Sequence, residues 1–320
     1  MNRIEIMLLR ISPIRVVPSL LLVLTAVVVT FFFNHSSTAS GQESSVPIYR
    51  STTSEVRLVF FATDKNNHPI QELQAEDFVV VDNEKVVRDF LTFTRVGVID
   101  LDVVVLMDFS ESVLPHLQKE ITDVLQLISL WPWKAGDRLS VLSFSGMEER
   151  LVCSENCRSL NQMQLASLPS GGTTPLFDAL EMAADLILQR RKPDVWPVII
   201  IFSDGNDTVS KASLLTVWEK LLISGAQIYS IDIGARGQPS DGQTVLQRLA
   251  DGFGGRLVPI SDGARAIVNY EIDDLRSARM VTYAPPLSAS DFHSIRILPT
   301  HSQKWKFRSR CGYYRPSDAP

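Results

Sequence analysis

The feature that most constrains the fold of this chain is an apolar run, residues 103–107, that stops abruptly at an acidic residue. A largely β-branched run of this length is typical of a strand buried on both faces of a parallel sheet. Asp108, Ser110 and Ser112 follow it in alternation. In open α/β sheets, ligands bind at the edge where such strands end. We therefore expect a polar site at this strand end.

The local sequence leaves two interpretations of these polar residues open. In an extended or tightly turned loop their oxygens can converge on one point, and hydroxyl and carboxylate oxygens suit Mg²⁺, Mn²⁺ or Ca²⁺ better than zinc. In the other interpretation, Asp108 begins a turn and Ser112 caps a helix that starts near Val113. The Asp-x-Ser-x-Ser pattern by itself fits both.

Two later stretches favour the metal site. Residues 170–175 form a glycine-rich loop in which a threonine precedes a proline suited to opening a helix. Residues 198–205 form a second apolar strand that ends in Ser203 and Asp204. With these stretches the chain resembles the von Willebrand factor type A family. In that family a metal-ion-dependent adhesion site combines Asp-x-Ser-x-Ser, a distant threonine, and an aspartate at the end of the fourth strand.

The resemblance covers roughly residues 102–260 and implies a metal site of five residues in the expected order. Thr173 is an adjacent candidate for the threonine, but Thr174 stands four residues before Asp178, which matches the family pattern Thr-x-x-x-Asp. The candidate metal-site residues are therefore Asp108, Ser110, Ser112, Thr174 and Asp204.

The resemblance also implies how such a site would act. The two serine hydroxyls would bind the ion directly and Thr174 directly or through water, whereas Asp108 and Asp204 would act mainly through water and hydrogen bonds. The expected ion is Mg²⁺, with Mn²⁺ or Ca²⁺ as alternatives. An open coordination position would accept an acidic side chain of a protein partner. The expected function is metal-dependent adhesion to a protein.

Two other functions compete with adhesion. A metal-dependent hydrolase needs a nucleophile with an adjacent base or paired carboxylates. The five histidines are scattered, and the chain has no His-Glu-x-x-His, Gly-x-Ser-x-Gly or Walker motif. A structural envelope protein would keep the fold without a functional metal. The complete site pattern favours adhesion, and we expect no enzyme activity. A net charge of -5 without a basic cluster argues against nucleic-acid binding.

Residues 1–39 are expected to direct export. Arg3, Arg10 and Arg15 precede an apolar run, residues 16–33, and small polar residues follow. This order is typical of a signal peptide with a cleavage site near residues 37–39. The length of this run is also close to the roughly 20 residues that a helix needs to span a bilayer. An uncleaved membrane anchor is therefore the alternative. The rest of the chain would be periplasmic, cell-surface or secreted, with residues 40–54 as a linker.

The chain contains three cysteines, which fit export. Cys153 and Cys157 are close enough to form a small disulfide loop in an oxidising compartment, although spacing alone does not establish bridging geometry. Together with the separate Cys311, they do not form the spacing of a zinc site.

Alternating strand and helix patterns over residues 100–275 predict an α/β fold, a doubly wound, mostly parallel sheet covered on both faces. Helices are expected at 113–130, 175–189, 211–223 and 244–250, with strands between them. Residues 55–96 and 276–320 alternate with period two and read as strands, one of them at 86–93. We expect these terminal segments to pack together as a β-sandwich-like module, with the type A domain inserted between its halves.

The terminal segments carry a second resemblance. Residues 73–78 read Leu-Gln-Ala-Glu-Asp-Phe, residues 82–85 form an Asp-x-x-Lys hairpin, and residues 310–313 read Arg-Cys-Gly-Tyr. These features are similar to those of the exported bacterial proteins called VWFA-related, which are frequent in Acidobacteria. The glycine of their hairpin is replaced here by Asn83, which adopts the left-handed conformation less easily.

Overall fold

The computed structural model describes residues 55–96, 99–192, 194–234, 240–260, 268–269, 274, 277–287, 291–301 and 304–314. These residues lie in one compact unit, Thr52–Pro320. The expected export signal and linker, residues 1–39 and 40–54, lie outside the described residues. Across the described ranges, no helix combines the length and hydropathy that a membrane span requires.

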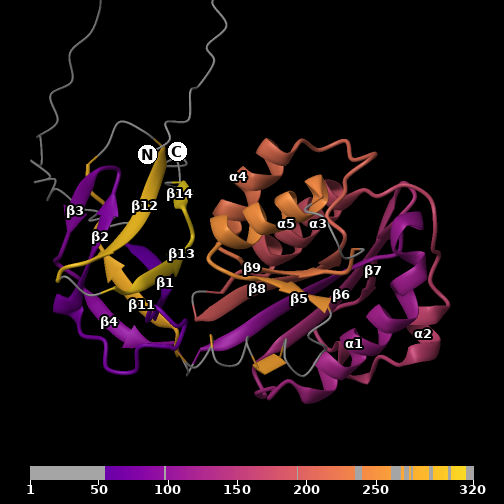
Figure 1. The fold of residues 1–320 in the computed structure, drawn as a ribbon, viewed down its shortest axis with the longest axis horizontal. Helices are drawn as coiled ribbons and strands as arrows, with labels where there is room; N and C mark the ends of the chain where they lie inside the picture. Colours follow the sequence, from indigo (N-terminus) through magenta and orange to yellow (C-terminus); the bar gives the residue numbers. More distant parts are fainter. Residues whose placement is uncertain are drawn as a thin grey trace, which may run out of the picture. The chain divides into compact units, whose positions relative to one another are not determined.

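A six-stranded sheet with the order β10-β9-β8-β5-β6-β7 forms the centre of the α/β domain (Figure 1). Its strands pair in parallel except for β7, which pairs antiparallel with β6 at one edge. This arrangement confirms the predicted mostly parallel α/β fold. The strands are β5 (Asp100–Asp108), β6 (Arg138–Ser145), β7 (Glu148–Cys153), β8 (Val195–Ser203), β9 (Gln227–Asp232) and β10 (Leu257–Pro259).

Helices cover both faces of this sheet, as the apolar run at β5 requires (Figure 1). Val103 and Val105 point into a core that contains α1, whereas Val104 and Leu106 point into a second core that contains α3, α4 and α5. Successive residues of a strand face opposite sides, so a strand covered on both sides must be apolar throughout. The helices are α1 (Leu117–Leu130), α2 (Gln162–Ala166), α3 (Leu176–Gln189), α4 (Leu214–Ser224) and α5 (Asp241–Gly252).

The expected helix at 113–130 is wrong at its start. The chain forms a 3-10 helix, η2 (Glu111–His116), before α1 begins at Leu117. Pro115 lies inside η2, and a proline lacks the N–H that a continuous α-helix would use at this position. The short helix α2 was not predicted, although Asn161 and Gln164 form a reciprocal capping box at its start.

Strands from the two ends of the chain share two four-stranded sheets, β13-β1-β11-β4, in which they alternate, and β14-β12-β2-β3, in which they lie in two neighbouring pairs. Thus β1 pairs with β11 and β13, and β12 pairs with β2. A shared aromatic core lies between the sheets, with the rings of Phe60 and Phe78 4.9 Å apart. The strands are β1 (Val56–Thr63), β2 (Phe78–Asp82), β3 (Lys85–Val87), β4 (Thr92–Arg95), β11 (Arg279–Tyr283), β12 (Phe292–Pro299), β13 (Lys306–Ser309) and β14 (Gly312–Tyr314).

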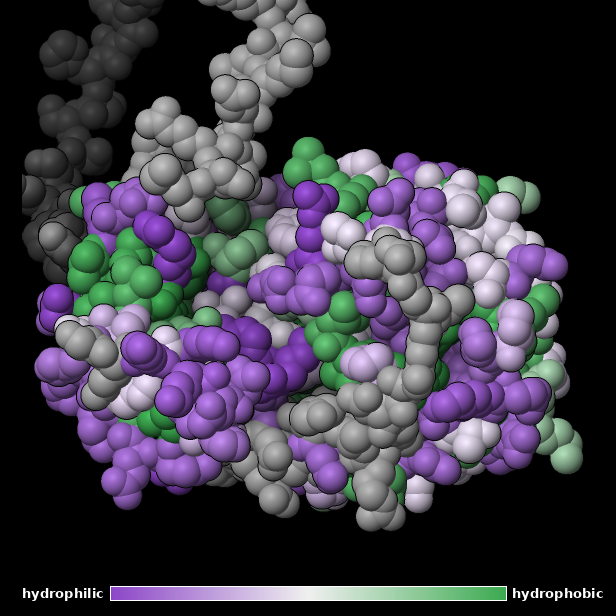
Figure 2. Space-filling model, in the orientation of Figure 1, coloured by the Kyte–Doolittle hydropathy of each residue, from purple (hydrophilic) through white to green (hydrophobic). Residues whose placement is uncertain are grey.

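The expected single strand at 86–93 is also wrong. The chain forms β3 in one sheet and β4 in the other, so the residues between them cross from sheet to sheet. The hairpin between β2 and β3 turns at Asn83 and Glu84, both of which have positive φ, as a two-residue hairpin turn requires. In Figure 2 apolar side chains gather over the part of the surface that contains β2, β3 and β12, where Val86 and Leu298 are exposed.

A buried hydrogen-bond network joins four strands of this β module. Asp82 is fully buried, and one of its carboxylate oxygens accepts hydrogen bonds from Tyr283 and Tyr313, each at 2.9 Å. His293 Nδ1 lies 2.5 Å from the other carboxylate oxygen. A carboxylate in this position requires such donors, because an unpaired buried polar group is costly.

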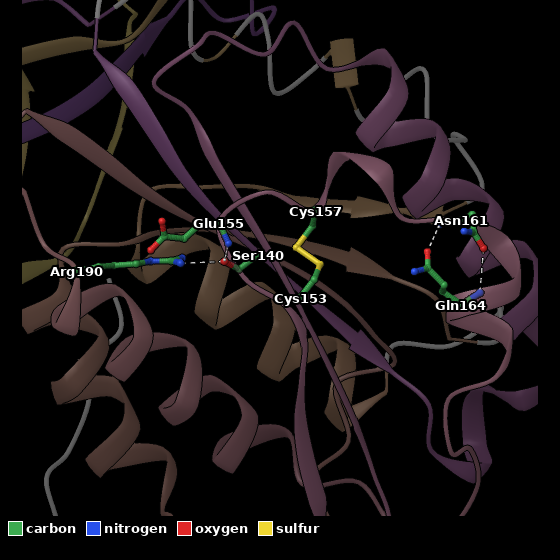
Figure 3. Close-up of a disulfide and its surroundings, with 7 residues drawn as sticks. All are labelled: Ser140, Cys153, Glu155, Cys157, Asn161, Gln164 and Arg190. Carbon is green, nitrogen blue, oxygen red and sulfur yellow. Dashed lines mark hydrogen bonds between the residues drawn. A yellow bond between two sulfur atoms is a disulfide. The ribbon is translucent and has the colours of Figure 1, made fainter.

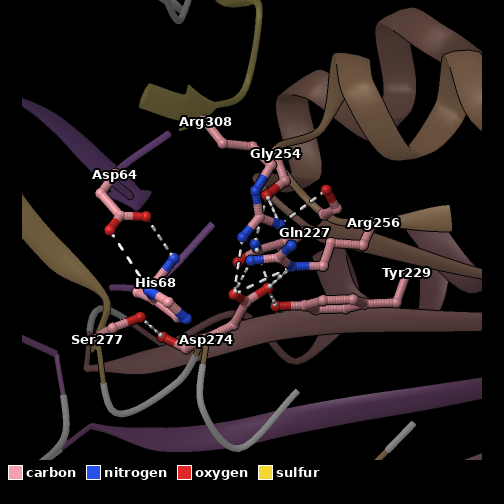
Figure 4. Close-up of polar contacts among 10 residues, drawn as sticks. Asp64, His68, Gln227, Tyr229, Gly254, Arg256, Asp274, Ser277 and Arg308 are labelled. Carbon is pink, nitrogen blue, oxygen red and sulfur yellow. Dashed lines mark hydrogen bonds and ion pairs between the residues drawn. The ribbon is translucent and has the colours of Figure 1, made fainter. Parts of the chain in front are cut away.

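A second network joins the C-terminal strands to the α/β domain (Figure 4). Asp274 is buried, and its carboxylate accepts hydrogen bonds from Arg256 at 2.9 Å and from Arg308 at 2.8 Å. Tyr229 donates a further hydrogen bond to Asp274 at 3.2 Å. Arg308 also donates to the carbonyl of Gly255 at 2.8 Å. The guanidinium of Arg308 therefore fastens β13 to the turn that precedes β10.

The cysteine pair that the sequence leaves open is bonded (Figure 3). Cys153 ends β7, and Cys157 begins the 3-10 helix η3 (Cys157–Ser159). Beside the disulfide, the hydroxyl of Ser140 accepts hydrogen bonds from the Glu155 N–H at 3.0 Å and from Arg190 Nη1 at 2.9 Å (Figure 3). Cys311 has a free thiol and is half-buried. The disulfide therefore fixes the path of the chain as it leaves the edge strand.

Candidate metal site

Two of the three loops expected at the site leave the same edge of the sheet. Strand β5 ends at Asp108 and its parallel neighbour β8 ends at Ser203. Because parallel neighbours end at the same edge, the loops that follow them begin side by side. The third loop is the glycine-rich segment that precedes α3.

Asp108 is fully buried and links the first loop to the second. Its Oδ1 accepts a hydrogen bond from the Ser110 N–H at 2.9 Å, and its Oδ2 accepts one from the Ser203 hydroxyl at 2.6 Å. The Ser203 hydroxyl in turn accepts a hydrogen bond from the Gly205 N–H at 3.0 Å. Ser203 is not among the predicted site residues. The available signal was a hydroxyl at the end of an apolar strand, directly before Asp204.

Backbone hydrogen bonds hold the glycine-rich loop against the Asp108 loop. The Gly171 N–H donates to the carbonyl of Phe109 at 2.7 Å, and the Glu111 N–H donates to the carbonyl of Gly172 at 3.0 Å. Gly171 and Gly172 have φ values of +99° and +78°, in the region that favours glycine. The glycines therefore permit the close approach of these two loops.

The structure distinguishes the two candidate threonines. The Thr173 hydroxyl donates to the carbonyl of Gly146 at 2.5 Å, in the turn between β6 and β7. Thr174 is buried, and its N–H donates to the Thr208 hydroxyl at 2.8 Å. The Thr208 N–H donates back to the carbonyl of Thr174 at 2.9 Å. Thr174 thus lies where the glycine-rich loop meets the Asp204 loop. The N-cap residue of α3 is Pro175, so the Thr174 hydroxyl is not the N-cap of that helix.

The structure does not support the helix-cap interpretation of the serines. Ser110 is buried and Ser112 is exposed, and their hydroxyl oxygens lie 3.3 Å apart. Ser110 occupies the N-cap position of η2 without making a side-chain cap, and α1 begins only after His116. Neither hydroxyl therefore caps a helix.

Asp204 lies at the front of the second loop and is nearly buried, with an exposed fraction of 8%. Its Oδ1 accepts a hydrogen bond from the Asn206 N–H at 3.0 Å. The next residue, Gly205, has φ +81°, and a Cβ placed there would lie 2.1 Å from the carbonyl oxygen of Gly242 in α5. Only glycine fits this contact, so the N-terminal end of α5 fixes the backbone that carries Asp204.

The environment of Asp108 disfavours its negative charge. Burial raises the pKa of Asp108 to about 6, and the negative charge of Asp204 contributes to this rise, whereas the hydrogen bonds from Ser110 and Ser203 oppose it. Among the described residues, the ion pairs include neither aspartate. Two neighbouring buried carboxylates without a basic partner are an unfavourable arrangement that a cation would relieve.

A third acidic residue lies behind this site. Glu120 of α1 is fully buried, and neither carboxylate oxygen has a hydrogen-bond partner within the described part of the chain. Burial first, and then the negative charge of Asp108, raise the pKa of Glu120 well above its usual value. Burial therefore favours the protonated form of Glu120 more than it would for an exposed glutamate. Its only signal in the sequence is a glutamate on the apolar face of a predicted helix.

The residues around the site position the loops. The Asp178 carboxylate accepts hydrogen bonds from the N–H groups of Lys211 and Ala212, at 3.0 and 2.8 Å. The described residues contain no cluster of three or more His, Cys, Asp or Glu side chains that could hold a metal. The oxygens available here are mostly neutral hydroxyls with two carboxylates behind them, a hard donor set that suits Mg²⁺ or Mn²⁺.

Comparisons with known proteins identify this part of the chain. Residues 103–206 match the model of the von Willebrand factor type A domain. The magnesium-chelatase 60 kDa subunit of Cereibacter sphaeroides is 32% identical over 116 residues, which are 32% of this chain and 21% of that protein. The corresponding subunit of Rhodobacter capsulatus is 30% identical over 106 residues, 32% of this chain and 19% of that protein. The chain thus spans about a fifth of the length of these curated relatives.

Among solved structures, manganese-loaded TRAP protein of Plasmodium vivax is similar with a TM-score of 0.44 and 17% identity. The match covers 75% of this chain and all of that one. BatB of Bacteroides thetaiotaomicron gives a TM-score of 0.41 and 16% identity, covering 54% of this chain and 98% of that one.

Proposed function

Because this chain contains a von Willebrand factor type A domain, we propose that it is an exported, metal-dependent protein-binding module of the adhesion type. One observation carries the proposal. Asp108 is buried beside Asp204 without a basic partner among the described ion pairs, at a point where three loops are hydrogen-bonded together. A divalent cation is the simplest group that would balance these charges.

The proposed ion is Mg²⁺, with Mn²⁺ or Ca²⁺ as alternatives. Ser110 and Ser112 would hold it through their hydroxyls, with Thr174 directly or through water. Asp108 and Asp204 would orient the bound waters and balance the charge. Neutral hydroxyl ligands leave most of the charge of the ion uncompensated. When bound, the ion would therefore supply a strong attraction for an anionic oxygen.

The proposed partner is a protein that presents an acidic side chain. Its carboxylate would complete the coordination of the ion, which prefers six oxygen ligands in the case of Mg²⁺. Ser112 is exposed, so the approach to the site lies on its side of the loop. The partner would be met outside the cytosol. The N-terminal sequence pattern and the disulfide between Cys153 and Cys157 both support export.

The structure gives less support to the competing functions. A hydrolase that used Asp108 as its nucleophile would need a base that contacts it, yet the hydrogen bonds of this carboxylate come from Ser110 and Ser203 and not from Asp204. The magnesium-chelatase subunits match over only about a fifth of their length, which does not carry an enzymatic activity to this chain. A purely structural protein would have no need to bury two carboxylates without a counter-charge.

A metal-dependent pull-down from envelope or extracellular fractions tests the proposal. Wild-type protein should retain a partner in 1 mM Mg²⁺ or Mn²⁺ and release it in EDTA. Ser110→Ala removes one proposed ligand, so retention should fall at least about tenfold, the lower end of the effect of losing a group that supports a metal. Ser159→Ala removes an exposed hydroxyl in η3, outside the site, and should behave like wild type.

The pull-down can also refute the proposal. Capture that persists unchanged in EDTA, or that is equal for Ser110→Ala and Ser159→Ala, would show binding through another surface. Capture that is absent under every metal condition, from fractions of the source organism, would favour the structural alternative.

A further inference from the structure

We propose that a cleft at the amino ends of the central strands, opposite the candidate metal site, binds a small organic anion. The ligand would be a carboxylate or phosphate on an apolar body, and Arg310 would bind its charged group. The cleft has a volume of about 900 Å³. It is lined by the first residues of β8 and β9, by β1, and by Tyr313. The carboxyl ends of β5 and β8 carry the candidate metal site, and none of its five residues lines this cleft.

The walls of the cleft are largely apolar. Val59 of β1 and Met280 of β11 contribute from the β module, whereas Trp196 of β8 and Leu222 of α4 contribute from the α/β domain. A volume of this size is within the range of small-molecule sites, which combine apolar walls with a few placed polar groups. The walls would therefore accommodate the apolar body of a ligand.

Arg310 supplies the placed polar group. Its Nη2 donates to the carbonyl of Arg57 at 2.8 Å, and its guanidinium carbon lies 5.6 Å from the centre of the Tyr313 ring. Its Nε is buried and has no hydrogen-bond partner among the described residues. The ion pairs of the described residues also include none that joins Arg310 to a carboxylate. A permanently charged guanidinium that lines a cleft and has no carboxylate partner among these ion pairs favours an anionic ligand.

A second arginine adds positive charge beside Arg310. Arg191 also lines the cleft, is exposed, and donates to the carbonyl of Ile223 at 3.4 Å. Burial lowers the pKa of Arg310, the nearby hydroxyls of Tyr283 and Tyr313 oppose this change, and the charge of Arg191 adds to it. Glu219 and Asp291 line the cleft as well, but neither forms an ion pair with these arginines among the described contacts.

A structural role for Arg310 explains only part of these observations. Helix α4 ends with Gly225, and a Cβ placed on Gly225 would lie 3.8 Å from Arg310 Nη1, so the charge lies close to the negative end of the helix. This placement leaves the guanidinium without a carboxylate partner among the described ion pairs. Because Nε is buried, a planar carboxylate or a phosphate in the cleft would accept from the two Nη groups together, a fork geometry that arginine offers.

Isothermal titration of the full chain with three ligands of matched chain length tests the site. The ligands are octanoate, octyl phosphate and uncharged octanol. We expect at least one anion to bind at least tenfold more tightly than octanol, and the stronger anion identifies the head group. Arg310→Gln should lower the affinity for that anion at least tenfold, and Arg191→Gln should lower it by less. Arg150→Gln, an exposed arginine on β7, should leave binding unchanged.

Several outcomes would overturn the proposal. They are the absence of binding for both anions, equal binding of octanol, or equal affinity in Arg310→Gln and wild type. Circular dichroism checks that Arg310→Gln is folded. If it is not, Arg310→Lys keeps the charge but loses the fork, and the same tenfold loss is expected. Binding should also be unchanged in EDTA, because the cleft and the candidate metal site lie at opposite edges. A dependence on metal would contradict the assignment.

Discussion

Replacing Asp108 with asparagine is expected to stabilise the metal-free protein above pH 6 and to weaken its response to a divalent metal. Burial raises the pKa of Asp108 from its usual 3.8 to about 6 in the folded state. The folded protein therefore holds this proton more tightly than the unfolded chain does. As pH rises from 4 to above 6, the ionised buried carboxylate costs stability that asparagine does not cost.

The expected size follows from the same pKa. A rise from 3.8 to about 6 corresponds to about 3 kcal/mol. In EDTA, the unfolding free energy of Asp108→Asn minus that of wild type should be near zero at pH 4 and about 3 kcal/mol at pH 7.5. In 1 mM Mn²⁺ wild type should gain stability by mass action, whereas the variant should bind the metal about 10- to 100-fold more weakly.

Urea unfolding across this pH range, with and without metal, measures both effects. Asp89→Asn is the matched control, because Asp89 is exposed in the β module. It should show neither the pH-dependent difference nor the loss of metal response. A difference between Asp108→Asn and wild type that does not change with pH would contradict the burial and charge assigned to Asp108.

Replacing Asp274 with alanine is expected to lower the unfolding free energy by about 3–5 kcal/mol, the usual cost of removing one partner of a buried ion pair. Asp274 is buried and binds Arg256 and Arg308, so the substitution would remove the carboxylate that these two partly buried guanidinium groups share. Arg308 lies on β13, and the loss should therefore loosen the C-terminal strands where they meet the α/β domain.

Thermal and urea unfolding of Asp274→Ala measure this cost. The control is Asp194→Ala, which removes an exposed carboxylate 3.9 Å from Arg57. An exposed pair of this kind contributes less than about 1 kcal/mol. Hydrogen exchange should show faster opening of β13 in Asp274→Ala than in the control. Equal stability of the two variants would show that the Asp274 network does not hold the strands.

The sequence predicted the α/β domain better than the β module for a physical reason. A strand buried on both faces is a continuous apolar run, and the apolar runs that begin at residues 103 and 198 lie within β5 and β8. Segments in which apolar and polar residues alternate predict strands, but they do not predict the sheet to which each strand belongs. Residues 88–91 contain neither glycine nor proline, so nothing local marks the crossing between β3 and β4.

Sequence patterns also predict only part of the candidate site. The resemblance to the type A family identifies Asp108, Thr174 and Asp204 because they belong to a motif. Ser203 and Glu120 interact with Asp108 across the fold, over a separation that local sequence does not encode. The unpaired Nε of Arg310 is likewise visible only in three dimensions.

Anomalous diffraction at the manganese edge, from crystals grown with Mn²⁺, tests the central claim most directly. The proposal predicts one strong peak at the loop edge of β5 and β8, about 2 Å from the hydroxyl oxygens of Ser110 and Ser112. Thr174 should lie within direct or water-mediated reach of the same peak. A map with no peak between these loops at saturating Mn²⁺, or with manganese bound only elsewhere, would contradict it.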